Sequence, residues 1–264
     1  MSARDRRLIA SALLLVATVV GLLIALAPGR TRHRAAPMPS ASAAAAGQQP
    51  HRFTIGYSVR GRRIDAIERA APHVMRTVMV VGCIHGDERA GIAIARRLLM
   101  ASAPPASAMW IIPNLNPDGA AADTRQNADG VDLNRNFPWH WRALGTRGDP
   151  QFSGRAVLSE PESRAAYRLI LRVRPQVTIW FHQPLGLVDL SGGDLRIERK
   201  FARLVGLPTR RLTRYPGSAV HWENALLVGS AAFVVELPPG SLPTAAISRY
   251  VRAVLELATP GASR

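Results

Sequence analysis

Three apolar segments of this chain each end in a residue that can bind a metal ion or move a proton. The segments span residues 78–84, 177–181 and 231–235, and the residues that follow them are His85, His182 and Glu236. Apolar runs of this kind, rich in β-forming residues, predict buried strands. In an open α/β sheet, ligands bind beyond the carboxyl ends of parallel strands. The three residues are therefore expected to converge on one site, although they lie far apart in the sequence.

The rest of the chain alternates between predicted strands and predicted helices. Strands are expected at about residues 76–84, 107–113, 177–182 and 231–236, and helices at about 89–102, 161–174, 194–206 and 244–258. This alternation predicts an α/β fold with a mixed, mainly parallel sheet and helices on both faces. The 214 residues after residue 50 are enough for one such domain and too few for two, so residues 51–264 are predicted to form a single catalytic domain.

His85 and Glu88 are three residues apart, a spacing that allows both side chains to bind the same metal ion. Zinc binds neutral imidazole nitrogen and carboxylate oxygen at about 2.0–2.2 Å, and a catalytic zinc site has three protein ligands and a water. The pair alone is also compatible with a strand-to-helix turn that exposes two polar residues. A third ligand is needed, and His182 can supply it.

With these residues in view, the chain resembles the zinc carboxypeptidase family over about residues 52–258. The motifs follow one another in the family's order and are His85-x-x-Glu88, Asp132-x-Asn134-Arg135-Asn136, Ser159-Glu160-Pro161-Glu162, His182, Tyr215 and Glu236. Within the family the chain is most similar to the short bacterial murein tripeptide amidases. That similarity rests on Arg125-Gln126-Asn127, on residues 130–138 and on Tyr215-Pro216-Gly217-Ser218.

The resemblance implies one zinc ion per chain, bound by His85, Glu88 and His182. Asp132 would accept a hydrogen bond from the other ring nitrogen of His85 and so fix that imidazole; alternatively it is a turn-forming aspartate. Glu236 would be the general base, because zinc lowers the pKa of its bound water and a neighbouring carboxylate can carry that proton to the leaving amine. A glutamate at the end of an apolar strand is costly to bury without a partner, which favours this role.

The resemblance also implies roles for four residues around the metal. Arg125 would stabilise the oxyanion that forms on the scissile carbonyl. Asn134 and Arg135 would bind the terminal carboxylate of the substrate, to which a guanidinium can donate two hydrogen bonds. Tyr215 would move over the bound substrate and hydrogen-bond near the scissile amide. The alternatives are a solvated arginine at position 125 and a tyrosine packed in a turn at position 215.

These assignments predict a zinc metallocarboxypeptidase or peptide amidase, a hydrolase that cleaves an amide bond next to a free carboxylate. Peptidoglycan peptides are candidate substrates, with the D-glutamyl to diaminopimelate bond as the cleaved amide. Two alternatives stay open: an amidohydrolase of the aspartoacylase or succinylglutamate desuccinylase type, and a non-catalytic module that binds wall peptides. The segment Asn116-Pro117-Asp118-Gly119 and Tyr215 favour the peptidase, and the presence of every ligand and of the base favours an enzyme.

The chain begins with a basic segment, residues 1–7, and continues with about twenty residues without a charge, 8–27. This length spans the hydrocarbon core of a bilayer as a helix, so the segment is predicted to be an uncleaved membrane anchor. The alternative is a signal segment that is cleaved, which would release a secreted protein. Residues 28–50, rich in Ala, Pro and Ser, are predicted to be a disordered linker. The protein is therefore expected to cross the cytoplasmic membrane once, with its catalytic domain outside.

The formal net charge of +16 is compatible with attraction to anionic polymers or to a membrane surface. The alternative is a compositional bias, because nearly all of the cationic residues are arginine. Nucleic acid is not an expected partner, because the sequence shows no recognisable binding module or aromatic platform. Cys83 is the single cysteine, so it cannot form an internal disulfide and is interpreted as a small core residue.

Ser159 and Glu162 have the spacing of a capping box. Glu160 and Glu162 are accordingly interpreted as helix-start residues and not as catalytic ones. The polar, glycine-rich segment 113–155 precedes them, and segments of that length inside a compact domain are usually functional or disordered.

Overall fold

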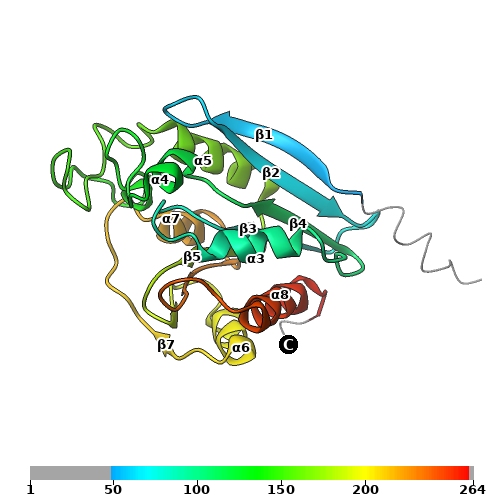
Figure 1. The fold of residues 1–264 in the computed structure, drawn as a ribbon. Helices are drawn as coiled ribbons and strands as arrows, with labels where there is room; N and C mark the ends of the chain where they lie inside the picture. The colour runs from blue at the N-terminus through cyan, green and yellow to red at the C-terminus, as the bar shows by residue number, and fades with distance from the viewer. Residues whose placement is uncertain (1–48, 262–264) are drawn as a thin grey trace, which may run out of the picture. The chain divides into compact units, whose positions relative to one another are not determined.

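The computed structural model describes residues 49–261. The predicted basic segment 1–7, the predicted anchor or signal segment 8–27 and linker residues 28–48 lie outside the described residues. Within residues 49–261, no helix combines the length and the apolar character that crossing a membrane requires. These residues form an α/β domain around one sheet (Figure 1).

The sheet of the described domain has eight strands, and its middle is parallel. The strands are β1 His51–Tyr57, β2 Arg63–Ala70, β3 Arg76–Val81, β4 Ser107–Ile112, β5 Val177–His182, β6 Leu187–Asp189, β7 Thr209–Arg210 and β8 Ala231–Glu236. Their order across the sheet is β1-β2-β4-β3-β5-β8-β6-β7. Strands β4, β3, β5 and β8 run parallel, whereas β2 and β6 run antiparallel to the parallel strands that they flank. The mixed sheet predicted from the sequence is confirmed.

Helices cover both faces of the sheet (Figure 1). They are α3 Ala90–Leu98, α4 Pro117–Ala122, α5 Pro161–Val173, α6 Leu195–Val205, α7 Ala219–Leu226 and α8 Thr244–Ala258, with a short 3-10 helix, η1, at Leu133–Arg135. Helices α3, α6 and α8 pack on one face, and α5 and α7 pack on the other. The predicted two-faced arrangement of helices is confirmed.

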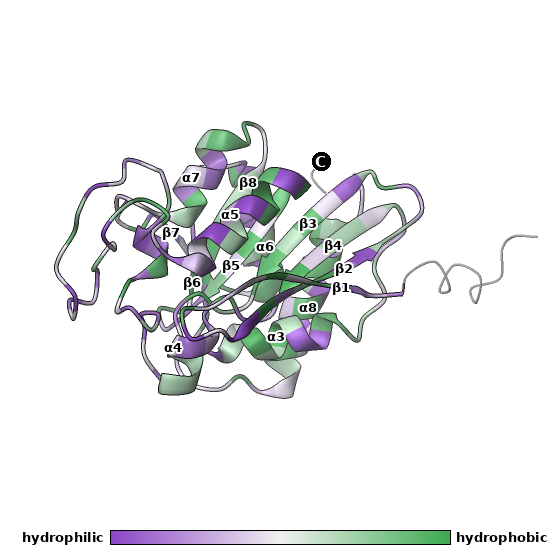
Figure 2. Ribbon diagram, turned by 90° about the horizontal axis from the view of Figure 1, so that it is seen from above, coloured by the Kyte–Doolittle hydropathy of each residue, from purple (hydrophilic) through white to green (hydrophobic). Residues whose placement is uncertain are grey.

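Strand β5 shows how one sequence serves both faces. Ile179 and Phe181 point into the core with α3, α6 and α8, whereas Trp180 points into the core with α5 and α7. Because side chains alternate along a strand, His182 leaves the strand on the same face as Trp180. Figure 2 shows the apolar residues that make the central strands suited to burial on both sides.

The predicted capping box at the start of α5 is wrong. Pro161 occupies the first helical position, so Glu160 becomes the N-cap, and its side chain accepts no capping hydrogen bond. Ser159 Oγ donates to Glu160 Oε1 at 2.6 Å and does not cap the helix. The side-chain amide of Asn127 donates to Glu160 at 2.6 Å and to Glu162 at 3.1 Å. The two glutamates therefore lie at the helix start, as interpreted from the sequence, but they hold the preceding loop in place.

Candidate active site

The carboxyl ends of the parallel strands place the four central residues of the site. His182 ends β5 and Glu236 ends β8, and the two are neighbours in the strand register. His85 and Glu88 lie in the turn that joins β3 to α3. This turn passes against α4 at Gly86, where a Cβ atom would lie only 1.9 Å from a backbone carbonyl carbon of that helix. A side chain at this position would push the turn away from α4, so glycine permits the close approach.

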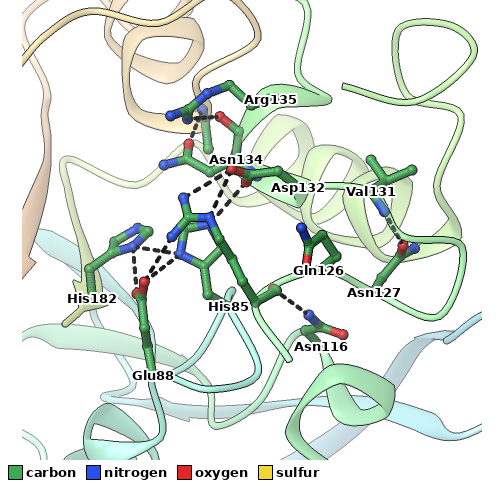
Figure 3. Close-up of polar contacts among 12 residues, drawn as sticks. His85, Glu88, Asn116, Gln126, Asn127, Val131, Asp132, Asn134, Arg135 and His182 are labelled. Carbon is green, nitrogen blue, oxygen red and sulfur yellow. Dashed lines mark hydrogen bonds and ion pairs between the residues drawn. The ribbon is translucent and has the colours of Figure 1, made fainter. Parts of the chain in front are cut away.

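Three side chains form a cluster with the dimensions of a metal site. The candidate ligand atoms of His85, Glu88 and His182 all lie within 4.8 Å of one another. His85 Nδ1 is 2.9 Å from Glu88 Oε1, His182 Nδ1 is 2.9 Å from Glu88 Oε2, and the two Nδ1 atoms are 3.2 Å apart (Figure 3). Ligands about 2.1 Å from a tetrahedral ion are about 3.4 Å from each other, so small shifts would seat zinc between them.

Asp132 holds His85 from the side opposite to this cluster. Its Oδ1 is 3.0 Å from His85 Nε2, and the same oxygen accepts the backbone N–H of Asn134 at 2.9 Å. Arg125 donates to Asp132 Oδ2 through Nε at 3.1 Å and Nη2 at 2.9 Å, and to Glu88 through Nη1 at 3.0 Å. A carboxylate on one ring nitrogen leaves the other nitrogen of His85 directed at Glu88, which is the arrangement that metal-binding histidines require.

The electrostatics of the cluster favour a cation. Burial alone would raise the pKa of Glu88, but the imidazoles of His85 and His182 hold it well below its usual range. Burial alone would lower the pKa of His85, but Glu88 and Asp132 raise it to about 9. Burial would also raise the pKa of Asp132, which His85 and Arg125 hold below its usual range. Two ionised carboxylates therefore surround the imidazoles, and a metal ion held by His85, Glu88 and His182 would bring positive charge to this site.

Glu236 faces the cluster with an unused oxygen. Among the described residues, its Oε2 is buried and has no hydrogen-bond partner. Burial raises the pKa of this carboxyl above its usual range, although His182 opposes the shift. A buried carboxylate oxygen without a partner costs free energy unless a ligand or water uses it. This position and this pKa direction suit a residue that accepts a proton during catalysis.

Arg135 and Tyr215 form a separate contact beside the cluster of His85, Glu88 and His182. The guanidinium carbon of Arg135 lies 4.1 Å from the centre of the Tyr215 ring, close enough for a cation–π interaction. Arg135 Nη1 donates to the backbone oxygen of Asn134 at 2.8 Å, while its Nε is buried without a partner in the described structure. Asn134 Oδ1 accepts the backbone N–H of Ala219 at 2.9 Å, which leaves the amide nitrogen of Asn134 as its donor to a ligand.

The loop after Tyr215 is pressed against Arg135. Gly217 has φ +76°, and a Cβ atom there would lie 1.9 Å from the backbone oxygen of Arg135. Both the left-handed conformation and the close approach require glycine at this position. The close approach at Gly217 thus brings the segment that carries Tyr215 next to Arg135.

One cavity of about 360 Å³ joins these groups. Every residue predicted as a metal ligand, a catalytic group or a substrate-binding group lines it, and Asp132 lies behind His85. The cavity also includes Asp189, Leu212 and His221, which sequence reasoning did not assign to the site. His221 is buried, stacks on Trp139 with ring centres 4.7 Å apart, and contributes to the cavity wall.

Comparisons with known proteins agree with this geometry. A model of the zinc carboxypeptidase family matches residues 40–188, more than half of the chain, and this segment includes the three candidate ligands. The chain therefore belongs to the zinc carboxypeptidase family, a family of hydrolases. Tyr215 and Glu236 lie beyond the matched segment.

Individual relatives include bacterial murein peptide amidases. The chain is 32% identical over 174 residues to murein peptide amidase A of Vibrio campbellii, covering 61% of this chain and 69% of that protein. It is 31% identical over 122 residues to murein peptide amidase A of Escherichia coli K12, covering 42% of this chain and 50% of that protein. The chain thus spans about half the length of the Escherichia coli relative that it matches.

Solved structures share the fold over most of the domain. The murein-tripeptide amidase of Escherichia coli O157 superposes with a TM-score of 0.66 and 28% identity, covering 81% of this chain and 94% of that chain. Carboxypeptidase A of Helicoverpa armigera superposes with a TM-score of 0.70 over 83% of this chain and 69% of that chain, but at 18% identity it shows the fold alone.

Proposed function

We propose that this chain is a zinc-dependent carboxypeptidase that cleaves an amide bond next to a free carboxylate in peptidoglycan peptides. The observation that carries the proposal is the position of Glu236 Oε2, buried and without a partner, in the same cavity as the cluster of His85, Glu88 and His182. The similarity to murein peptide amidases supports wall peptides as substrates, with the D-glutamyl to diaminopimelate bond as the cleaved amide.

The donor set fits one zinc ion per chain, held by His85, Glu88 and His182. Bound zinc would polarise the scissile carbonyl and lower the pKa of its water ligand toward neutrality. Glu236 would accept the proton of the attacking water and return it to the leaving amine. Asp132 would keep the His85 ring in the orientation that directs Nδ1 at the metal.

Arg125 and Arg135 would each bind a different negatively charged group. Arg125 would stabilise the oxyanion of the reaction, and Arg135 would bind the terminal carboxylate of the substrate. Arg125 already lies against Glu88, so its guanidinium is close enough to the metal cluster to stabilise an oxyanion that forms there. Arg135 and the free amide nitrogen of Asn134 would bind the terminal carboxylate. Tyr215 lies over Arg135 and would close on the substrate from that side.

The location of the protein is part of the proposal. A membrane anchor formed by residues 8–27, with the catalytic domain outside the cytoplasmic membrane, would bring the enzyme to wall peptides; a secreted form is the alternative. Protease added to intact spheroplasts should remove the domain from an anchored protein. Full protection of the domain would place it inside the cell and contradict this arrangement.

A substrate panel separates the candidate functions. The zinc-loaded protein should hydrolyse murein tripeptide and ordinary peptides with a free C-terminus, and blocking the terminal carboxylate should abolish turnover. Cleavage of N-acyl amino acids alone would identify an amidohydrolase of the aspartoacylase type. Zinc-loaded protein that cleaves none of these compounds would be a binding module. Equal cleavage of blocked and free peptides would contradict the roles of Asn134 and Arg135 but leave the zinc chemistry intact.

A further inference from the structure

The three most exposed large apolar side chains of the described domain lie at the amino edge of the sheet, where the parallel strands begin. They are Val228 at 93% exposure, Met100 at 77% and Met75 at 72%. They belong to the loops that lead into β8, β4 and β3, respectively. Figure 1 shows the loops before β3 and β4 at the right of the view, at the end of the domain where β1 begins. Single exposed apolar residues are ordinary on a protein surface, whereas a group of them at one edge indicates an interaction site.

Hydrogen bonds join these loops to one another along the edge. The backbone N–H of Met75 donates to the carbonyl oxygen of Ala106, in the loop before β4, at 2.8 Å. In the loop before β5, Gln176 Oε1 accepts the backbone N–H of Thr77 at 2.6 Å, and the Gln176 carbonyl accepts that of Ala231 at 3.0 Å. The loops 71–75, 99–106, 174–176 and 227–230 therefore form one continuous surface, the amino-edge surface.

The amino-edge surface carries positive charge. No aspartate or glutamate occurs in its four loops. Arg97, in the last turn of α3, is exposed, and its carbonyl oxygen accepts the backbone N–H of Met100 at 3.1 Å. Arg174, the C-cap of α5, is also exposed and lines a cavity of about 210 Å³ together with Val228. Within residues 49–261 neither arginine forms an ion pair. Both guanidinium groups are therefore available to an anionic partner.

Two acidic side chains border the amino-edge surface, and each has a cationic partner. Asp194, whose backbone N–H donates to the Ser230 carbonyl, pairs with Arg196 at 2.8 Å. Glu256, in the last turn of α8, pairs with Lys200 at 2.9 Å. These carboxylates therefore leave the charge of the surface positive.

The chain enters the described domain at this same edge. Strand β2 is antiparallel to both β1 and β4, so β1 runs in the direction of the parallel strands and begins where they begin. The first residue of β1 is His51. The preceding part of the chain, which includes the predicted anchor 8–27, is thus attached beside the amino-edge surface and not beside the candidate active site.

We propose that the amino-edge surface binds the headgroup region of an anionic lipid bilayer and directs the candidate active site away from the membrane. Met75, Met100 and Val228 enter the headgroup region, and Arg97 and Arg174 contact lipid phosphates. An anionic polymer would use the two arginines but not the apolar side chains. The carboxyl ends of the strands, with the cavity, then face the solution in which peptides diffuse. The inference goes beyond the proposed hydrolysis and does not depend on it.

The test compares fluorescent probes at the two edges of the full-length protein. Cys83 is fully buried, so a cysteine introduced on the surface can be labelled selectively. Met100→Cys places the probe on the amino-edge surface. Tyr57→Cys is the matched control, because Tyr57 is 56% exposed and ends β1 at the opposite edge. Each labelled protein is reconstituted with vesicles of phosphatidylcholine and phosphatidylglycerol in equal parts, which contain lipids with a nitroxide quencher on the headgroup.

The probe at position 100 should be quenched severalfold more strongly than the probe at position 57, because only the first contacts the headgroups. Vesicles of phosphatidylcholine alone should reduce this difference, since they lack the negative charge that the arginines bind. Equal quenching of the two probes, or stronger quenching at position 57, would overturn the proposal.

Charge variants of the Met100→Cys protein test the arginines. Arg97→Gln combined with Arg174→Gln should lower the docking equilibrium constant, obtained from the quenched fraction, by about thirtyfold, the loss expected for two arginines at an anionic membrane surface. Arg60→Gln combined with Arg142→Gln is the control with the same change in net charge. These two arginines are exposed in the loops that follow β1 and η1, away from the amino edge. An equal loss in the control would show that net charge alone attracts the protein, which would contradict a defined surface.

Met75→Ser combined with Val228→Ser tests the apolar contacts. Both side chains are exposed, so the free energy of unfolding should stay near that of wild type, while quenching at position 100 should fall. Full quenching in this variant, together with its loss in the arginine variant, would identify binding by charge alone and overturn the lipid assignment. Neither residue lines the cavity, so hydrolysis of soluble peptides should be unchanged. If no peptide is hydrolysed by any of these proteins, the proposed hydrolysis fails and the quenching result still decides the docking.

Discussion

The two faces of the sheet are built from the same strands but have different roles. The face covered by α3, α6 and α8 carries a large apolar cluster that includes Phe181, Phe201 and Phe233. The face covered by α5 and α7 is also apolar in its centre, but at the carboxyl edge it holds His85, His182 and the groups bound to them. Chemistry is therefore confined to one edge of one face, where each buried polar atom needs a partner or a ligand.

This difference between the two faces shows how the fold accommodates several buried charged side chains. The apolar face contributes stability without any requirement for precise polar partners. On the other face, Asp132, Arg125 and Glu88 satisfy one another through hydrogen bonds of 2.9 to 3.1 Å. We expect substitutions on the two faces to separate activity from stability.

The largest effect is expected for Glu236→Gln, at the carboxyl edge of the face that α5 and α7 cover. Glutamine keeps the shape of the side chain but cannot accept the proton, so turnover should fall by a factor of about 10² to 10⁴, as is typical for loss of a general base. Zinc content and the free energy of unfolding should stay near those of wild type. Steady-state kinetics with metal analysis measures this, and turnover within a fewfold of wild type would show that another group moves the proton.

Phe233→Ala tests the opposite face. Phe233 is fully buried on β8 and packs against Phe201 with ring centres 5.4 Å apart. Truncation of such a residue leaves a cavity and should lower the free energy of unfolding by about 3 to 5 kcal/mol. Denaturant unfolding provides the measurement. Under conditions where the variant is folded, its kcat should remain close to that of wild type; a selective loss of zinc would mean that the two faces are not separable.

Glu223→Gln tests a buried carboxyl on the face of the sheet that α5 and α7 cover. This carboxyl does not line the cavity. Glu223 lies on α7, accepts the indole N–H of Trp180 at 3.2 Å and the hydroxyl of Thr178, and burial raises its pKa from 4.5 to about 7. Below pH 4.5 the carboxyl is protonated in both the folded and the unfolded states. As pH rises from 4.5 to 7 only the unfolded state releases the proton, so stability falls, by about 3 kcal/mol in total.

Glutamine mimics the protonated form and removes this loss. Relative to wild type, Glu223→Gln should be more stable at pH 8 by an amount of that order and nearly unchanged at pH 4.5. Urea unfolding of metal-free protein at both pH values gives the comparison. A difference that is the same at both pH values would show that folding does not raise the pKa of Glu223.

The parallel strands of the sheet could be predicted because each is an apolar run of five residues or more. The structure places β3, β4, β5 and β8 where the sequence indicated, and it brings the predicted ligands together at their carboxyl ends. The approach of His85, Glu88 and His182 to one another was predictable for a physical reason. Parallel strands end at the same edge of the sheet, so residues that follow them can meet there although they are remote in the sequence.

Other parts of the site depend on pairings that leave no local signal. Strand β6 is three residues long, and the direction of Asp189 follows from its antiparallel pairing with β8. Helix α7 is short, and only its packing turns His221 toward the cavity. The capping box failed because Pro161 moved the cap by one residue, which freed Glu162 to bind the loop through Asn127.

Metal analysis of the full-length protein tests the central claim most directly. Wild type should bind one zinc ion per chain, and His182→Ala should lose it, because the alanine removes one of three protein ligands. His73→Ala is the matched control, since His73 is exposed in the loop before β3, away from the carboxyl ends of the strands. It should keep its zinc. Wild type without stoichiometric zinc, or unchanged zinc content in His182→Ala, would contradict the assignment of the site.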